Sequence, residues 1–145
     1  MPGISVREIA IADTRPLRHA ILRPHQTLEE LAAQEPRGAL AIGAFASDKL
    51  VAVGFVAPDG EPGSWRIRGM ATAPEARGQG AGTAVLDALV AYACDHGATR
   101  LWCNARTPAR SLYERAGFVV ASDEFEPPHI GPHFTMERNI AAASC

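Results

Sequence analysis

Three glycines, Gly78, Gly80 and Gly82, stand close together in the segment RGQGAG, which begins with Arg77. The segment lies between a strand-like stretch, WRIRGMAT, and a helix-like stretch, AGTAVLDALVAYACDHG. A glycine-rich turn that leads into a helix presents unpaired backbone N–H groups at the positive end of the helix dipole, which suits phosphate. A turn that binds nothing would need only one glycine. The spacing therefore predicts an anion site.

The two common phosphate-binding motifs do not fit this turn. A P-loop requires lysine after its last glycine, but Thr83 and Ala84 follow Gly82. A Rossmann fingerprint that starts at Gly78 and Gly80 requires a third glycine at position 83, and it normally opens a domain. What remains is R-x-x-G-x-G at the junction of a strand and a helix.

Other side chains give weaker signals. Cys94 and His96 are two residues apart on a predicted helix and face different ways, so a metal site is not expected. Arg66 and Arg68 lie on one side of a predicted strand. If that side faces an acceptor pocket, they favour an acceptor with a carboxylate or phosphate; if not, they are solvated edge charges. We expect the second case for Arg66, and the sequence does not decide for Arg68.

The elements that must position these residues follow from the period of the apolar residues. Thr27 and Glu30 form a capping box, Thr14 is a candidate N-cap, and Ser47-Asp48 is a hairpin turn. The order predicts one mixed α/β domain over residues 1–145, with early antiparallel pairing and a strand–helix–strand crossover. Strands are predicted over residues 4–13, 38–46, 49–57, 65–72, 99–105, 118–125 and 133–140, and helices over 14–24, 25–36, 80–96 and 108–117.

Composition limits the class of protein. The chain has 145 residues, of which 47% are hydrophobic, and a net charge of -2, so nucleic acid is not an expected partner. No apolar stretch approaches the ~18 residues of a membrane span, and the N-terminus does not resemble a signal peptide. Cys94, Cys103 and Cys145 have no disulfide-framework spacing. A cytoplasmic protein without a membrane partner is predicted.

The stretch RGMATAPEARGQGAGTAVLDAL resembles the acetyl-CoA-binding motif of the GNAT superfamily of N-acetyltransferases, which carries [QR]-x-x-G-x-[GA] at this junction. LWCNARTPARSLYERAGF is similar to the family's next strand and its helix with A-x-x-x-Y-E-x-x-G-F. The order of elements also matches, so the resemblance covers nearly the whole chain. Two end segments, LRHAILRPHQ and DEFEPPHIGPHFTMER, are similar to an ElaA-like branch, although the order Ile130-Gly131-Pro132-His133 differs from that branch's Gly-Ile-Pro-His.

The resemblance implies a fold and a cofactor site. The fold is a mostly antiparallel twisted sheet of about six to seven strands, with a parallel splayed pair at the cofactor site and about four flanking helices. Amides of the glycine turn would hold the pyrophosphate of coenzyme A, and main-chain groups of the preceding strand would pair with the pantetheine arm and stabilise the oxyanion. The implied cofactor-binding residues are Met70, Ala71, Thr72, Arg77, Gly78, Gln79, Gly80, Ala81, Gly82, Asn104 and Tyr113.

Tyr113 matches the family's tyrosine and is the predicted general acid, since a phenol with a pKa of ~10 can protonate a departing thiolate. Its alternative role is to fill the core. The general base is less defined, because SWRIRGMAT has no glutamate. His133 is the candidate base, with Glu124 beside it, and the alternative for His133 is a hydrogen-bonded turn histidine.

The expected function is transfer of an acetyl group from acetyl-CoA, a cosubstrate, to a primary amine of a small molecule or peptide. Direct attack in a ternary complex is expected, because no convincing nucleophilic cysteine or serine is present to form an acetyl-enzyme. No metal is expected to take part. The alternative is a coenzyme-A-binding regulatory module of the same fold, which would need the glycine turn but not Tyr113. A monomer or a homodimer is expected.

Overall fold

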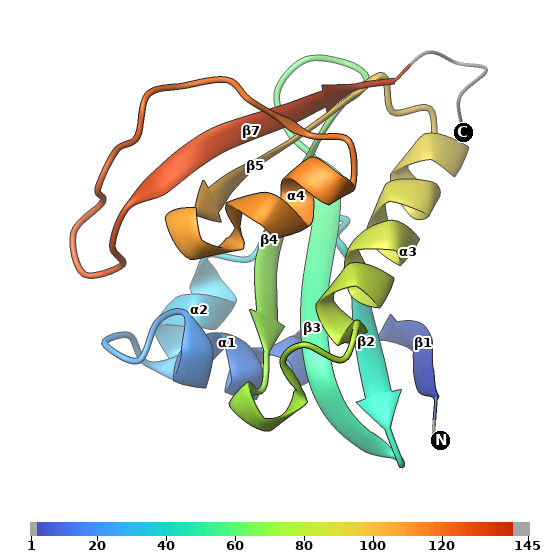
Figure 1. Cartoon of the computed structure of the whole chain (residues 1–145), viewed down its shortest axis with the longest axis vertical. Helices are drawn as coiled ribbons and strands as arrows, with labels where there is room; N and C mark the ends of the chain where they lie inside the picture. Colours follow the sequence, from blue (N-terminus) through green and yellow to red (C-terminus); the bar gives the residue numbers. More distant parts are fainter. Residues whose placement is uncertain (1–2, 141–145) are drawn as a thin grey trace.

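The computed structural model describes residues 3–140, which form one seven-stranded sheet flanked by helices (Figure 1). The strand order is β1-β2-β3-β4-β5-β7-β6; β4 and β5 pair in parallel, and the other neighbours pair antiparallel. The predicted fold class is confirmed. The strands are β1 (Ile4–Ile9), β2 (Leu40–Ala46), β3 (Lys49–Pro58), β4 (Ser64–Thr72), β5 (Arg100–Arg106), β6 (Val119–Val120) and β7 (His133–Asn139). The α-helices are α1 (Arg15–Ile21), α2 (Leu28–Ala33), α3 (Ala81–Asp95) and α4 (Arg110–Arg115).

Local sequence signals explain several element boundaries. Ser47 and Asp48 have φ of 50° and 67°, as a tight hairpin requires, and they join β2 to β3 as predicted. The Thr27–Glu30 capping box is present at the start of α2. Thr14 is the N-cap residue of α1, as predicted, but its hydroxyl donates to the Ile11 carbonyl at 2.6 Å and caps no helical N–H group.

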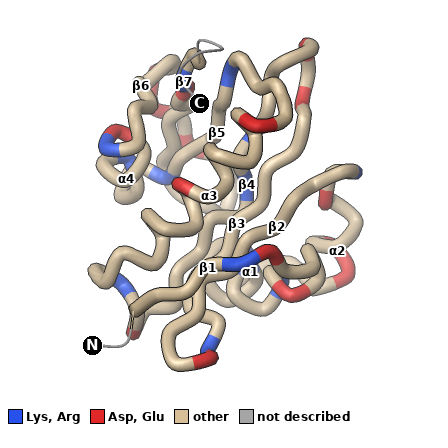
Figure 2. Tube along the Cα trace, turned by 90° about the vertical axis from the view of Figure 1, so that its right-hand side faces the viewer, with Lys and Arg blue, Asp and Glu red and all other residues tan. Residues whose placement is uncertain are grey.

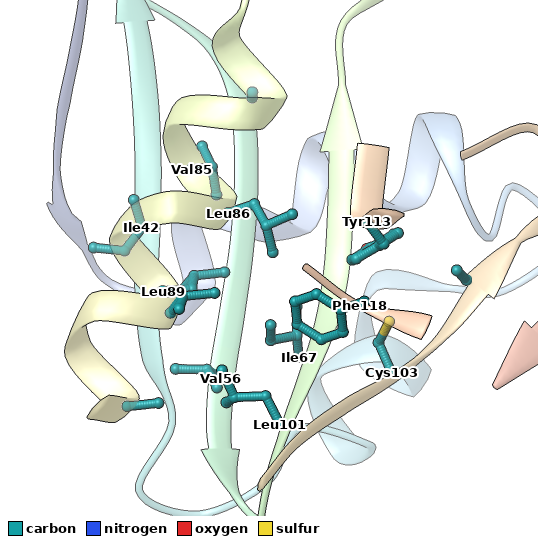
Figure 3. Packing of buried hydrophobic residues seen from close by; sticks show 14 of the residues in the cluster. Ile42, Val56, Ile67, Val85, Leu86, Leu89, Leu101, Cys103, Tyr113 and Phe118 are labelled. Carbon is teal, nitrogen blue, oxygen red and sulfur yellow. The ribbon is translucent and has the colours of Figure 1, made fainter. Parts of the chain in front are cut away.

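Two neighbouring residues of β3 separate the faces of the sheet. A Cβ built on Gly54 would lie 3.1 Å from Leu89 and 3.2 Å from Val85 of α3, whereas the Arg18 guanidinium of α1 lies 4.8 Å from the centre of the Phe55 ring. Because successive side chains of a strand point to opposite faces, α3 covers one face and α1 lies on the other. Figure 3 shows the apolar core between α3 and the sheet.

The parallel strands β4 and β5 stay together over only three residue pairs, from Ser64↔Arg100 to Arg66↔Trp102. Beyond these pairs the strands separate, and Figure 1 shows their arrowheads well apart. β4 also carries a bulge, where Gly69 (φ +69°) packs under the Phe55 ring and the register with β3 shifts. The predicted splayed pair is thus confirmed, and it leaves backbone groups of both strands without a ladder partner.

The strand predicted over 118–125 is mostly absent. Only β6 is regular, and Phe125 makes one isolated bridge with His133. Between them, the Ser122 hydroxyl accepts the Thr135 N–H at 2.9 Å in place of a backbone carbonyl. Such side-chain bonds compete with the ladder and interrupt the strand.

Three further features concern the cysteines, membrane spans and the distribution of charge. Cys103 is buried, while Cys145 lies outside the described residues. Within residues 3–140, no helix is both long enough and apolar enough to cross a membrane. Figure 2 shows basic and acidic segments mixed along the trace, with no long stretch of one sign.

Candidate active site

A cavity of about 220 Å³ opens where β4 and β5 diverge. Its wall combines the α1 end, the β4 bulge, β5, α4 and the loop before β7, so segments from the whole chain meet there. The lining residues are Arg18, Leu22, Arg23, Leu31, Gln34, Phe55, Arg66, Ile67, Arg68, Gly69, Met70, Asn104, Arg106, Tyr113, Phe125, Pro127, Ile130 and His133. Four residues predicted for the site, Met70, Asn104, Tyr113 and His133, are therefore brought together.

The glycine turn lies outside this cavity, at the N-terminus of α3. Gly78 (φ +77°) and Gly80 (φ +84°) adopt left-handed backbone conformations, and a Cβ on either would meet no atom within 4 Å. The N–H groups of residues 78–80 have no hydrogen-bond acceptor among the described residues. Those of Ala81 and Gly82 belong to the first helical turn, where intrahelical acceptors are lacking. The turn is therefore an open cradle of N–H donors.

The side chains of the turn leave this cradle open. Arg77 is exposed and makes no ion pair with the described residues, whereas the Gln79 amide donates back to the Glu75 carbonyl at 3.2 Å. Thr72, at the end of β4, adjoins the turn, since its Oγ1 lies 3.2 Å from a Cβ built on Gly82. Ala71 is buried beside it. The strand predicted for the pantetheine arm thus leads from the cavity to the turn.

Tyr113 lies on α4 and reaches toward the gap between β4 and β5 (Figure 3). The residue is 5% exposed, and its ring packs edge-on against Phe118, with ring centres 5.7 Å apart. Burial raises the pKa of Tyr113 well above its ordinary value, with a smaller contribution from Cys103. The phenol therefore stays protonated and borders the cavity, so it fills the core and can also act as an acid.

His133 begins β7 and is buried, with its ring stacked on Phe125. Its Nδ1 lies 2.8 Å from the Gly131 carbonyl. Because a carbonyl only accepts, Nδ1 carries the proton and Nε2 keeps a lone pair in the neutral ring. Burial lowers the pKa of His133, as do the cations Arg106 and Arg23, while the Gly131 bond opposes them. The ring is neutral near pH 7 and can accept a proton.

Two other predicted polar groups are already engaged. The Asn104 Oδ1 accepts a hydrogen bond from the Thr135 hydroxyl at 2.8 Å, so its amide N–H₂ is the end left for a ligand. The Glu124 carboxylate accepts from the Thr107 hydroxyl at 2.7 Å and does not line the cavity. Of the two candidate bases, only His133 borders the cavity.

Arginine dominates the charge of this wall, with five arginines and no acidic residue among the lining residues. Our expectation that Arg66 is a solvated edge charge was wrong: it lines the cavity, its guanidinium lies 4.6 Å from the Trp102 ring centre, and its Nε is buried without a hydrogen-bond partner among the described residues. The position left open, Arg68, also faces this pocket, where its Nη2 donates to the Gln34 carbonyl at 3.3 Å.

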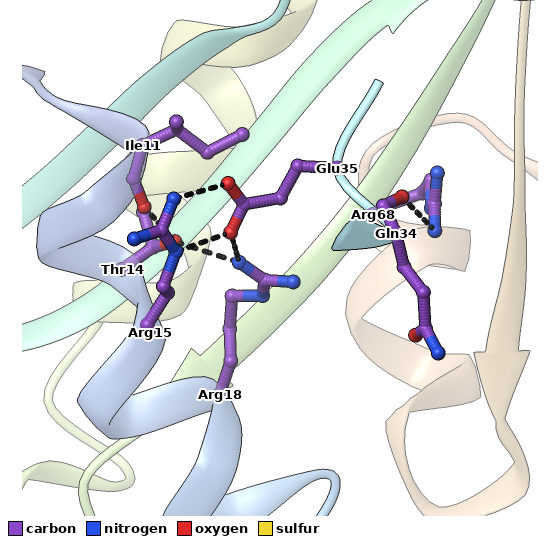
Figure 4. Close-up of polar contacts among 7 residues, drawn as sticks. All are labelled: Ile11, Thr14, Arg15, Arg18, Gln34, Glu35 and Arg68. Atoms are coloured by element: carbon purple, nitrogen blue, oxygen red, sulfur yellow. Dashed lines mark hydrogen bonds and ion pairs between the residues drawn. The ribbon is translucent and has the colours of Figure 1, made fainter. Parts of the chain in front are cut away.

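One of these arginines, Arg18, is held in an ion pair. Glu35 receives two hydrogen bonds of 2.7 Å from Arg15 and one of 2.6 Å from Arg18 (Figure 4). Although burial alone would raise it, these guanidinium groups hold the pKa of Glu35 below its ordinary value. The carboxylate is thus ionised and fixes the start of α1 to the segment after α2.

Sequence analysis missed three contributors to the site. Arg23 lines the cavity from the end of a predicted helix, Arg106 from just beyond a predicted strand, and Gly69 forms the bulge that shapes the cavity floor. The available signal was Gly69 itself, because an isolated glycine inside a strand pattern suggests a bulge. Nothing in local spacing brings residues 23 and 106 together. Within the described part of the chain, no three metal-ligating side chains cluster.

The comparisons with known proteins accord with this arrangement of turn, splayed strands and tyrosine. A model of the acetyltransferase (GNAT) family matches residues 5–118, which is most of the chain. The chain belongs to the GNAT family. Its membership makes it an acetyltransferase, and the predicted superfamily is confirmed.

Individual relatives agree with the family. The GNAT chain is 31% identical over 144 residues to the uncharacterized N-acetyltransferase YitI of Bacillus subtilis (strain 168), covering 94% of this chain and 97% of that protein. It shares its fold with Escherichia coli ElaA (TM-score 0.75, 17% identity, 96% of this chain and 100% of that one). It also superposes on N-acetylglutamate synthase from Neisseria gonorrhoeae, solved with coenzyme A and N-acetyl-glutamate (TM-score 0.71, 19% identity, 97% and 36% coverage). The similarity to ElaA shows a shared fold. Membership of an ElaA-like branch stays a prediction.

Proposed function

We propose that this protein transfers an acetyl group from acetyl-CoA to a primary amine by direct attack in a ternary complex. The observation that carries the proposal is the continuous path from the glycine cradle, along the splayed strand β4, to a cavity bordered by Tyr113. This path offers a phosphate site at one end and an acid at the other.

Three observations support a fit to coenzyme A. The turn over residues 77–82 has unpaired N–H groups and no Cβ to obstruct an anion at Gly78 or Gly80. The backbone of Met70, Ala71 and Thr72 lies beyond the last β4–β5 pair, where its N–H and C=O groups can pair with an amide-bearing arm. The exposed Arg77 adds a positive charge beside the cradle.

The chemistry then follows from this chain's own groups. His133 Nε2 accepts a proton from the acceptor ammonium, directly or through a water, and the free amine attacks the thioester carbonyl. A backbone N–H of β4 stabilises the oxyanion. When the C–S bond breaks, the Tyr113 phenol gives its proton to the thiolate. Asn104 holds the arm through its amide N–H₂.

The alternative is a regulatory module of the same fold that binds coenzyme A without transferring acetyl groups. It would need the turn but not a buried tyrosine bordering the cavity. Family membership and the position of Tyr113 together favour the enzyme.

Calorimetric titration with acetyl-CoA, with NADPH and ATP as controls, tests the first step. We expect selective binding of acetyl-CoA, followed by acceptor-dependent release of free thiol. Binding without thiol release for any amine would support the regulatory module. Absence of acetyl-CoA binding would overturn both.

A further inference from the structure

The lining of the cavity carries an uncompensated positive charge. Arg18 is paired with Glu35, but Arg23, Arg66, Arg68 and Arg106 have no carboxylate of the described residues within hydrogen-bonding distance. Within residues 3–140, the acidic group that pairs with one of these four is Asp59, 3.9 Å from Arg66 and outside the lining. Four cations thus share one small cavity.

These cations are close enough to affect one another. Burial lowers the pKa of Arg68, as does the nearby Arg66, and burial also lowers that of Arg23, with Arg106 as a further cause. Gathering like charges in a partly buried cavity costs free energy unless an anion enters. A bound anion would relieve this repulsion.

The hydrogen-bonding capacity of the cluster is also incomplete. The Nε atoms of Arg66 and Arg106 are buried and have no acceptor among the described residues. Arg106 uses its two Nη atoms to bind the Ile21 and Leu22 carbonyls at the end of α1, and this fixes its guanidinium in place. Buried donors without partners are rare in folded proteins, so the two guanidinium groups keep more positive charge than their surroundings compensate.

We propose that the arginine cluster Arg23, Arg66, Arg68 and Arg106 binds an anionic group of the acceptor, so that the substrate is a small primary amine carrying a carboxylate or a phosphate. The proposal rests on the acetyl transfer proposed above and names its substrate class. A cavity of about 220 Å³ is below the about 300–1,000 Å³ usual for drug-sized ligands, which favours a small molecule. Polyamines would be repelled.

The cluster also assists the reaction. Nearby positive charge lowers the pKa of an ammonium group, because it disfavours the charged form. The acceptor's anionic end is held by the arginines while its amine loses a proton more easily than in water. This helps to explain how the site functions without a glutamate on β4.

Four amines of matched length test the proposal: β-alanine, O-phosphoethanolamine, n-propylamine and 1,3-diaminopropane. We expect kcat/KM for acetyl transfer to be at least about tenfold higher for the two anionic amines than for n-propylamine, with the diamine poorest. The preference between β-alanine and O-phosphoethanolamine identifies the anion as carboxylate or phosphate. Equal use of neutral and anionic amines, or preference for the diamine, would overturn the proposal.

The variant Arg68→Gln should abolish the preference for anionic amines while acetyl-CoA affinity stays unchanged. Arg68→Lys should restore part of it. Arg66→Gln is the second variant, should the first not fold. Arg7→Gln is the matched control, because Arg7 is an exposed residue of β1, outside the cavity, and loses the same charge. An unchanged preference in folded Arg68→Gln and Arg66→Gln would count against the cluster.

A binding experiment separates this proposal from the acetyl transfer itself. Inorganic phosphate and β-alanine are titrated into protein saturated with coenzyme A, so that the glycine turn is already occupied. Binding that Arg68→Gln weakens at least about tenfold and Arg7→Gln leaves unchanged supports the anion site even if no probe is acetylated. If neither probe binds and neither is acetylated, the anion site is refuted, whatever acetyl-CoA does.

Discussion

At the scale of single residues, Tyr113 combines two requirements that rarely coincide. It is buried against Phe118, which fixes the ring, and it also borders the cavity, which gives its hydroxyl access to a ligand. Burial keeps its pKa high, so the phenol remains protonated across the physiological range. Because the phenol stays protonated, it has a proton to give when the thiolate leaves.

Tyr113→Phe should therefore lower kcat by about 10²-fold or more, with little change in the Kd of acetyl-CoA. The ring and its packing remain, so the folded structure should be kept. Tyr92→Phe is the matched control, since Tyr92 is the other tyrosine of the chain and stacks on His96 away from the cavity. Steady-state thiol release and calorimetry measure the two quantities. Equal turnover in Tyr113→Phe would remove this residue from the mechanism.

We expect the acid limb of the pH profile to follow the titration of His133, the proposed base. Since burial and nearby cations lower its pKa below the ordinary ~6.5, the ring loses its proton at a lower pH than free histidine. At saturating acceptor, kcat should be constant near pH 7 and fall as the pH drops through this lowered pKa. His133→Gln should remove that limb and reduce kcat by about 10²-fold. The control His96→Gln should keep the limb, and an acid limb that persists in His133→Gln would exclude His133 as the base.

At the scale of elements, the turn before α3 depends on glycine conformation and on open space. Gly80→Val forces a β-branched residue into φ +84° and should destabilise the fold by about 1–2 kcal/mol. It should also weaken acetyl-CoA binding at least tenfold, because the side chain occupies the cradle. Gly60→Val is the matched control: Gly60 has φ +89° and equally open surroundings, but lies in the β3–β4 turn. Calorimetry should show a loss of affinity in the first variant alone.

A buried ion pair between Arg18 and Glu35 connects α1 to the segment after α2. Glu35→Gln leaves Arg18 without its buried partner and should lower the free energy of unfolding by about 3 kcal/mol. Glu114→Gln removes a pair that is half exposed, with side-chain exposures of 45% and 46%, and should cost about 0.5 kcal/mol or less. Urea unfolding at pH 7 compares the two variants.

The pH dependence of stability gives a second measurement of the same pair. Because the pKa of folded Glu35 is lowered, its contribution is complete above the ordinary value of 4.5 and is lost as the pH falls through the lowered pKa. The stability difference between wild type and Glu35→Gln should shrink over that acidic range. A constant difference would show that the substitution acts through packing instead.

At the scale of the whole molecule, the order of elements was predictable because each strand and helix carries its own apolar period. The hairpin at Ser47-Asp48 and the glycine turn depend on local backbone chemistry, which sequence displays directly. The interrupted strand after β6 was not predictable, since it depends on a hydroxyl of Ser122 that meets Thr135 only in the folded state.

The candidate site shows the same division. The turn and Tyr113 were recognisable from motifs, while the arginine cluster comes from three separated segments whose convergence depends on topology. Arg23 follows α1, Arg66 and Arg68 belong to β4, and Arg106 ends β5. The strand period links Arg66 with Arg68, but no spacing rule links that pair to Arg23 or Arg106. The four arginines meet only in the folded structure, at the cavity where β4 and β5 separate.

The short β4–β5 ladder should also affect how fast backbone amides exchange with solvent. Strands β1–β4 and strands β5–β7 are joined by only three ladder pairs, and we expect this narrow seam to be where the sheet opens most easily. Backbone amides of residues 67–72 that face the seam should exchange with deuterium sooner than those at the centre of β2 and β3. A bound acetyl-CoA would bridge the seam and slow that exchange, whereas uniform protection in the free protein would show a single unit. Acetyl-CoA would then act as a bridging segment between β4 and β5, present when the cosubstrate binds and lost when the product leaves, so the stability of the sheet should vary within each turnover.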